Sequence, residues 1–329
     1  MRKLFAIGCV LQLVTSSVIL GAPDSVGLAR ESNNKLEVTG VFDALVGYSS
    51  NAASSPGETE FAGFILDDRA ATSASTLFGF GSNIRLRYSP EPNENFDGNA
   101  SASCRKYPSA GFVDECRLNA RVGATLARAH SVYAIAVSGS QTWLGGARNR
   151  TYIGATGSMN FAVRPRWNFI LEGAAGSLDY TEERFRVLSV RRLITSVGFS
   201  GRDLKPKNTA IGVFVIAKFD EPKNGLSTFG NFGYGFRVAV EQPINTRLRV
   251  FGEASALHTD YDGHFGFFFQ DRIEDAVNLN AGLLWTTKKD WVVTSQLRYT
   301  NTSSTISLFS FRRLEVIFDF QKKLPTRKN

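Results

Sequence analysis

Arginines and carboxylates recur two positions apart along much of this chain. Arg85 and Arg87 are spaced in this way, and so are Arg313 and Glu315. Side chains two positions apart on a β-strand point to the same face, so strands would gather these groups on one surface. Guanidinium groups bind anions and pair with carboxylates. Such a surface is either cross-braced by ion pairs or is a cation-lined channel that favours anionic or sugar-rich solutes, and the sequence leaves both interpretations open.

The same alternation, followed from strand to strand, defines one face that would point inward if the strands closed around a lumen. We expect its lumen-lining side chains to be Arg85, Arg87, Arg121, Arg237, Arg247, Arg249, Glu253, Arg298, Arg313 and Glu315. Further carboxylates fall on this face by parity, namely Asp43, Glu172, Glu274 and Asp319. Small residues dominate the face between 123 and 158, which would leave free volume inside.

Histidines and aspartates gather near the end of one predicted strand. His258, Asp260, Asp262 and His264 lie close together, and Ser255 precedes His258 by three residues. Nucleophilic catalysis requires a base held beside a Ser, but no flanking motif accompanies these residues. We expect no enzyme and no catalytic residue, and a hydrolase at the rim is the minor alternative.

No metal or cofactor site is expected. A calcium loop needs more carboxylates than the segment 260–263 supplies, and no glycine-rich phosphate motif follows a strand. Zinc is the rival interpretation for Cys104 and Cys116, but no His or further Cys lies nearby. An even pair in an exported chain instead predicts a disulfide. It would close a loop between two strands and add about 2–3 kcal/mol.

These side chains need strands to position them, and segments of apolar and polar alternation run from about 36 to 320. In the last segment, Leu314, Val316 and Phe318 alternate with Arg313 and Glu315. A soluble sandwich would alternate in the same way, but here a candidate secretion signal precedes the pattern. The combination predicts an all-β fold, a transmembrane antiparallel up-and-down β-barrel of about 14 strands, within roughly 12–16.

The connectors between the predicted strands differ in length at the two ends. The strands are 36–49, 74–89, 94–103, 117–128, 131–142, 150–163, 166–177, 185–200, 208–219, 228–241, 246–258, 272–287, 290–300 and 309–320. If the first strand runs outward, the long connectors 51–73, 104–116 and 259–271 lie outside. The short ones, with Pro, Asn or Lys, lie at the periplasmic end. This asymmetry favours a barrel over a sandwich.

Three regions divide the chain. Residues 1–22 resemble a signal peptide, with a basic start and an apolar run, and cleavage is expected between 21 and 29. The barrel is expected over 36–320, and 321–329 would form a basic periplasmic tail. Much of the formal charge of +8 lies in turns and in this tail, so we interpret it as solvated and expect no nucleic-acid partner.

Two apolar stretches lie in predicted outer loops. The loop 51–73 contains the run 61–66, and the loop 259–271 contains Phe265 and the phenylalanines of 267–269. The first either folds inward as a plug or packs on the barrel rim, and the second raises the same question. Either loop could receive a surface protein or a secretion partner.

The last fifty residues resemble the terminal hairpin of the surface lipoprotein assembly modifier barrels and of related β-barrel porins. The resemblance rests on Arg298-Tyr299, the Asn/Ser-rich segment 301–304, the stretch 309–313 with two aromatic residues before its arginines, and the closing Val316 and Phe318. The helical-repeat domain of the assembly modifiers is absent, and nine residues follow Phe320. The resemblance implies the fold and does not extend to lipoprotein export.

The sequence therefore predicts a barrel in the outer membrane of a Gram-negative bacterium. Its expected partners are outer-membrane lipid and the barrel-assembly machinery. The predicted function is a transport or export conduit for solute or polymer. The alternative is a non-conducting scaffold barrel whose outer loops bind a surface protein or secretion partner.

Overall fold

The computed structural model describes residues 35–52, 54, 60–61, 64–65, 74–204, 208–223, 229–265, 270–287, 289, 291–324 and 327–328. The predicted signal peptide and the phenylalanines of 267–269 lie outside these ranges.

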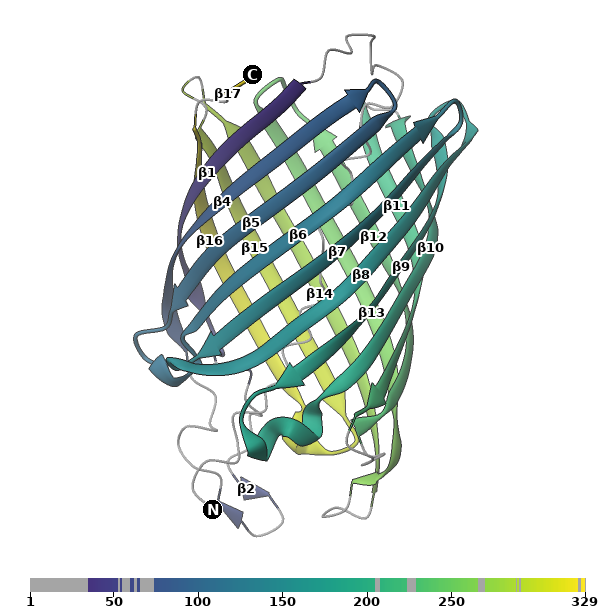
Figure 1. The fold of residues 1–329 in the computed structure, drawn as a ribbon. Coiled ribbons are helices and arrows are strands. Elements are labelled where there is room, and N and C mark those ends of the chain that lie inside the picture. The colour runs from purple at the N-terminus through teal and green to yellow at the C-terminus, as the bar shows by residue number, and fades with distance from the viewer. Residues whose placement is uncertain are drawn as a thin grey trace.

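Fourteen long strands form one closed antiparallel sheet. They are β1 (Lys35–Ser49), β4 (Ser75–Glu91), β5 (Glu94–Lys106), β6 (Glu115–Arg128), β7 (Ser131–Leu144), β8 (Ala147–Arg164), β9 (Trp167–Tyr180), β10 (Val190–Leu204), β11 (Thr209–Pro222), β12 (Asn231–Pro243), β13 (Leu248–Phe265), β14 (Gln270–Thr286), β15 (Trp291–Ser304) and β16 (Phe311–Lys323). Each pairs with its neighbours in sequence, and β16 pairs with β1 to close the barrel (Figure 1). The predicted up-and-down β-barrel is confirmed.

Alternation along each strand separates an apolar outer face from the interior. On β4, Phe78 is 49% exposed whereas its neighbour Leu77 is fully buried. On β11, Val215 is 60% exposed whereas Phe214 is 2% exposed. Since side chains alternate across a strand, the buried set points into the barrel and the exposed apolar set points outward. Exposed apolar side chains in such number are stable against lipid and costly in water.

One end of the barrel has short connections, at 92–93, 129–130, 165–166, 205–208, 244–247 and 287–290. The other end carries the longer ones, apart from the four-residue connection 266–269 and the two-residue turn Gly145-Gly146. There φ is +55° and +85° at the two glycines, a backbone conformation that a two-residue hairpin requires and that glycine adopts without strain.

The predicted strand boundaries differ most from the structure at the start of β10 and at the end of β13. Strand β10 begins at Val190, not at 185, because the short 3₁₀ helix η3 (Glu183–Leu188) occupies the preceding residues. Strand β13 extends to Phe265, so most of the predicted loop 259–271 is a continuation of the β13–β14 hairpin. The polar residues from 258 to 264 had indicated a loop, but a strand that reaches beyond the membrane does not need an apolar face.

The predicted outer loop 51–73 contains a hairpin of two short strands, β2 (Glu60–Phe61) and β3 (Phe64–Ile65). Figure 1 places it beyond the mouth of the barrel, at the end opposite to β17. The other two short 3₁₀ helices are η2 (Gly111–Val113) and η5 (Ser307–Phe309). Within the described part of the chain, no helix is long and apolar enough to cross a membrane.

The predicted tail 321–329 is partly ordered in strands. Strand β16 continues to Lys323, and β17 (Arg327–Lys328) pairs with Glu37 and Val38 of β1.

Candidate functional site: the charged inner wall

The structure places all but one of the predicted lumen-lining residues on the inner face. Arg85 and Arg87 share the parity of buried Leu77 on β4, and Arg313 and Glu315 share that of buried Ile317 on β16. The same parity holds for the predicted residues on the other strands, namely Arg121, Arg237, Arg249, Glu253 and Arg298.

Arg247 is the exception. It lies in the turn before β13, where it lines a hollow together with outward-facing side chains. The prediction placed Arg247 on the inner face by extending the alternation of β13 to a residue that precedes the strand, which begins at Leu248. Asn245 ends that alternation because its side-chain Oδ1 accepts the backbone N–H groups of Arg247 and Leu248, both at 2.9 Å, and so forms a turn.

Ion pairs cross the inner wall from strand to strand. Arg237 of β12 lies 3.7 Å from Glu172 of β9, whose carboxylate also accepts the Ser196 hydroxyl at 3.0 Å. Arg237 and Arg298 both act electrostatically on Glu253, which lies between them on β13. These interactions link the five strands β9, β10, β12, β13 and β15, which is the cross-bracing that one interpretation of the sequence predicted.

Charged side chains of the inner wall also interact across the seam where β16 pairs with β1. Arg105 of β5 acts electrostatically on Asp43 of β1, on Asp319 of β16 and on Arg298 of β15. Arg105 was not among the predicted lining residues, because the predicted strand ended at 103, whereas β5 reaches Lys106.

Phe214 points into the barrel interior beside Arg237. The guanidinium of Arg237 lies 4.7 Å from the centroid of its ring, a cation–π contact that also shields the ring from water. Sequence reasoning missed Phe214 because it lies in an apolar run where parity alone separates inner from outer residues.

A second cluster of charged side chains is buried nearer the end of the barrel that carries the longer connections. Asp220 accepts two hydrogen bonds from Arg192, at 2.7 and 2.8 Å, and lies 2.9 Å from the Lys218 ammonium. Lys218 and Asp220 are 2% and 3% exposed. Arg191, by contrast, points outward and pairs with exposed Glu221 at 3.2 Å. The two consecutive arginines thus point to opposite faces, as successive side chains of a strand do.

The wall formed by β6 to β9 carries mostly small inner side chains. One row of paired residues runs through Gly123, Ala136, Thr156 and Ala174. The free volume expected on this wall is partly taken by Tyr152, since a Cβ on Gly176 would lie 2.7 Å from its ring.

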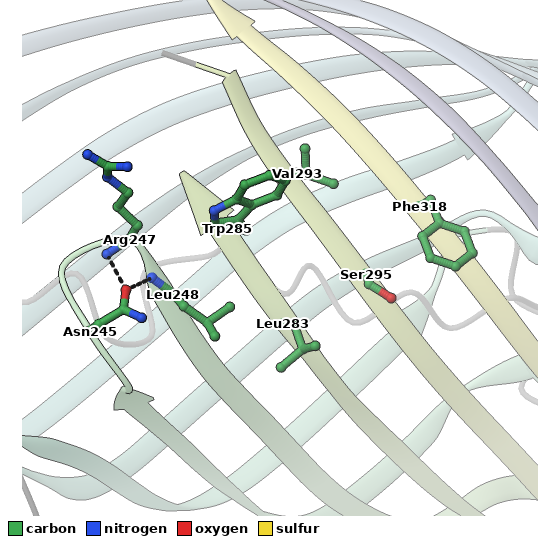
Figure 2. A pocket seen from close by; sticks show the side chains of 8 residues that line it. All are labelled: Asn245, Arg247, Leu248, Leu283, Trp285, Val293, Ser295 and Phe318. Carbon is green, nitrogen blue, oxygen red and sulfur yellow. Dashed lines mark hydrogen bonds between the residues drawn. The ribbon is translucent and has the colours of Figure 1, made fainter. Parts of the chain in front are cut away.

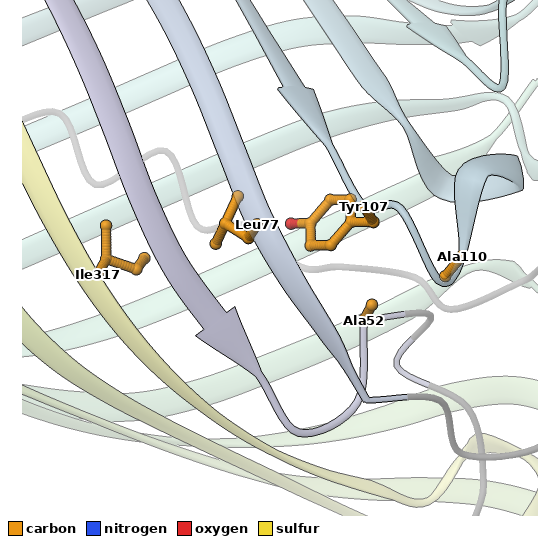
Figure 3. Packing of buried hydrophobic residues seen from close by; sticks show 5 residues of the cluster. All are labelled: Ala52, Leu77, Tyr107, Ala110 and Ile317. Carbon is orange, nitrogen blue, oxygen red and sulfur yellow. The ribbon is translucent and has the colours of Figure 1, made fainter.

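Cys104 and Cys116 form a disulfide between directly opposed positions of β5 and β6. The segment between them, 105–115, folds inward. Tyr107 and Ala110 pack against Leu77 and Ile317 of the inner wall, and Ala52 completes the cluster (Figure 3).

Asp114 stabilises the inward fold of this segment. Its side chain accepts the Tyr107 backbone N–H at 2.7 Å and the Lys106 ammonium at 2.9 Å. Burial, with a smaller contribution from nearby Glu315, raises the pKa of Tyr107 above its ordinary value, so its hydroxyl keeps its proton. Because the segment 105–115 folds inward, the disulfide-closed loop lines part of the barrel mouth.

The polar cluster around His258 lies on the outward face. His258 Nδ1 is 2.7 Å from Asp275, and its Nε2 is 3.3 Å from Asp260. Ser255 is on the inner face, because it is three positions before His258 and successive side chains of a strand point to alternate faces. The Ser–His arrangement considered from sequence is therefore not formed. His264 has no described side chain, and the described residues contain no group of three or more His, Cys, Asp or Glu that could hold a metal ion.

Comparison with solved structures shows the class of barrel. A loop L8 deletion mutant of OmpT, an outer membrane protein of Vibrio cholerae, aligns with a TM-score of 0.52 at 8% identity, covering 89% of this chain and 100% of that one. OmpT expressed in the outer membrane gives 0.50 at 8% identity, covering 90% and 99%. The protein is a bacterial outer-membrane β-barrel.

Sequence comparison adds no narrower family to this barrel. No protein-family model matches the chain, and no curated protein matches it in sequence. The resemblance of its last fifty residues to surface lipoprotein assembly modifier barrels is therefore confirmed only at the level of an outer-membrane β-barrel.

Proposed function

We propose that this barrel is a transport conduit that admits small polar solutes and favours negatively charged ones. The observation that carries the proposal is a set of arginines on the inner face of two strands that flank β5: Arg85 and Arg87 on β4 and Arg121 on β6, here called the arginine patch. All three side chains are exposed on the inner face. Among the described residues, no ion pair involves any of them.

The patch differs from the rest of the inner charge. Arg85 and Arg121 both oppose Asn99 of the intervening strand β5, whose amide donates to Asn83 at 3.1 Å. The residue between these two guanidinium groups is therefore a neutral amide. Arg87 is opposed by Asp97 of β5 and Glu37 of β1, but among the described residues no ion pair joins it to either carboxylate. Arg313, in contrast, is mostly buried, lies 3.8 Å from Glu315 and donates to Ser54 at 2.9 Å. Braced arginines hold the wall together, whereas the patch can bind a passing anion.

Ion selectivity tests this assignment. The refolded protein is placed in a planar bilayer under a KCl gradient, and the reversal potential is measured for the native chain and for the triple variant R85Q/R87Q/R121Q. We expect a preference for chloride in the native chain and its loss in the variant. The matched control is Arg191→Gln, which removes an outward-facing arginine and should leave the selectivity unchanged.

A cation preference in the native barrel would refute the role of the patch. So would a chloride preference that survives in the triple variant, since the selectivity would then arise elsewhere.

A second candidate function, a scaffold barrel, is favoured by inward-pointing side chains that are almost completely buried. Phe214, Lys218 and Ile317 are 2–3% exposed although they point into the barrel. A filled interior suits a scaffold barrel that conducts nothing and presents its outer hairpins to a surface protein or secretion partner. The β2–β3 and β13–β14 hairpins would be the candidate contact surfaces. Delivery by the barrel-assembly machinery is expected for either function.

A further inference from the structure

A hollow of about 510 Å³ opens on the outward face of the barrel, over β13 to β16 and beside the turn 244–247. It is lined by Asn245, Arg247, Leu248, Leu283, Trp285, Val293, Ser295 and Phe318. Figure 2 shows Leu283, Ser295 and Phe318 on three adjacent strands, with Asn245 and Arg247 at one end.

The hollow exists because one side chain is small where its neighbours are large. Ser295 is paired with Leu283 on one side and with Phe318 on the other. Leu283 and Phe318 are 47% and 42% exposed and stand out from the sheet. They therefore form the two walls of a slot whose floor is Ser295. Since this face meets lipid, a hydrocarbon chain is the chemistry that fits the slot.

One end of the slot is cationic. Arg247 is exposed, and within the described part of the chain no ion pair involves its side chain. Its backbone is fixed on both sides, by the Asn245 turn and by a hydrogen bond from the Thr286 N–H to its carbonyl oxygen at 2.8 Å. The guanidinium is thus attached to a rigid support at the edge of an apolar groove.

Aromatic residues show where this edge lies in the membrane. Trp285 and Trp291 are 51% and 42% exposed at the same end of the barrel. The Lys322 ammonium lies 5.6 Å from the Trp291 ring centroid. Exposed indole rings mark the level of lipid headgroups, so the cationic edge lies at the depth of the lipid phosphates.

We propose that the slot binds one glycerophospholipid, with an acyl chain over Ser295 between Leu283 and Phe318, and with the phosphate on the guanidinium of Arg247. The turn end faces the periplasm if the long loops are outside, so the lipid belongs to the inner leaflet. This site is independent of whether the barrel conducts.

Native mass spectrometry of the detergent-purified full chain tests the proposal. The probes are palmitoyl-oleoyl phosphatidylglycerol, the same diacylglycerol without phosphate, and glycerol phosphate without acyl chains. We expect one phosphatidylglycerol per barrel at low lipid-to-protein ratio, weaker retention of diacylglycerol, and no glycerol phosphate.

Two variants probe the two ends of the site. Arg247→Gln should weaken phosphatidylglycerol binding about tenfold, as expected for the loss of one charge-assisted hydrogen bond. Ser295→Leu should abolish binding by filling the slot, and Ser295→Val is the substitute if that variant does not refold. The matched controls are Arg128→Gln, an exposed arginine at the same end, and Ser82→Leu, an outward serine on β4. Both should bind as the native chain does, and heat-dependent gel mobility checks that each variant is folded.

Native-like phosphatidylglycerol binding in both site variants would overturn the proposal. Equal retention of diacylglycerol or of glycerol phosphate would also overturn it, because the two halves of the site would not then act together. A dimer of the chain that persists without lipid and is lost in Ser295→Leu would assign the slot to a second copy instead.

Discussion

At the scale of single residues, the structure divides the charged side chains of the inner face into those that form ion pairs and those, such as Arg85, for which no ion pair is present among the described residues. For Arg237 the bracing partner is Glu172, three strands away in the sheet. Parity in the sequence could place Arg237 on the inner face, but it could not supply that partner. The same limit applies to His258 and Ser255, which are near in sequence and on opposite faces.

The Asp220 group gives a prediction about stability. Replacing Asp220 by Asn should destabilise the barrel by about 3–5 kcal/mol, because it removes the buried carboxylate that accepts from Arg192 and lies 2.9 Å from Lys218, and so breaks a buried ion-paired cluster. Denaturant unfolding of the refolded protein, followed by tryptophan fluorescence, measures the change.

The control is Asp179→Asn, which removes a half-exposed carboxylate paired with Lys223 at 2.7 Å. Exposed pairs contribute only about 0–1 kcal/mol. If both substitutions cost the same, the Asp220 group would not be a buried brace.

At the scale of elements, most strands could be predicted from sequence because one face meets lipid and must stay apolar. The predictions failed where that requirement ends. Strand β13 continues past His258 beyond the membrane. The 3₁₀ helix η3 occupies the first residues of the strand that was predicted to begin at 185. Neither feature carries an apolar repeat, so the sequence pattern could not mark its boundaries.

The disulfide-closed segment was expected to be an outer loop, but its inward packing was not expected. Tyr107 and Ala110 contact residues far away in sequence, such as Ile317. Replacing both Cys104 and Cys116 by Ser should cost about 2–3 kcal/mol, since a closed loop of this length restricts the unfolded chain. The freed loop should also make channel currents noisier.

Unfolding midpoints and current recordings of the double variant, compared with the native chain under oxidising conditions, measure both effects. Unchanged current noise would show that the loop does not limit the pore.

The chain end provides a further prediction. Closure rests on the pairing of β16 with β1 from Val41 to Ser49, whereas β17 adds pairs only at Glu37 and Val38. Truncation after Lys323 should therefore leave a folded barrel with nearly native stability. Truncation after Phe311, which removes β16, should give no heat-modifiable band on a gel, and a folded product from that variant would contradict the closure.

At the scale of the whole molecule, the fold follows from a short physical argument. Alternating strands have one apolar face, and closing the sheet turns that face to lipid and leaves no unpaired edge. This part could be predicted from sequence alone. How much open space remains inside could not, because it depends on side chains such as Phe214 and Tyr152 and on the inward loop.

The central claim is that the barrel conducts, and single-channel recording of the intact refolded protein tests it most directly. We predict discrete current steps in a planar bilayer with KCl on both sides. An absence of steps from protein shown to be folded by its gel mobility would contradict the conduit and leave the scaffold barrel.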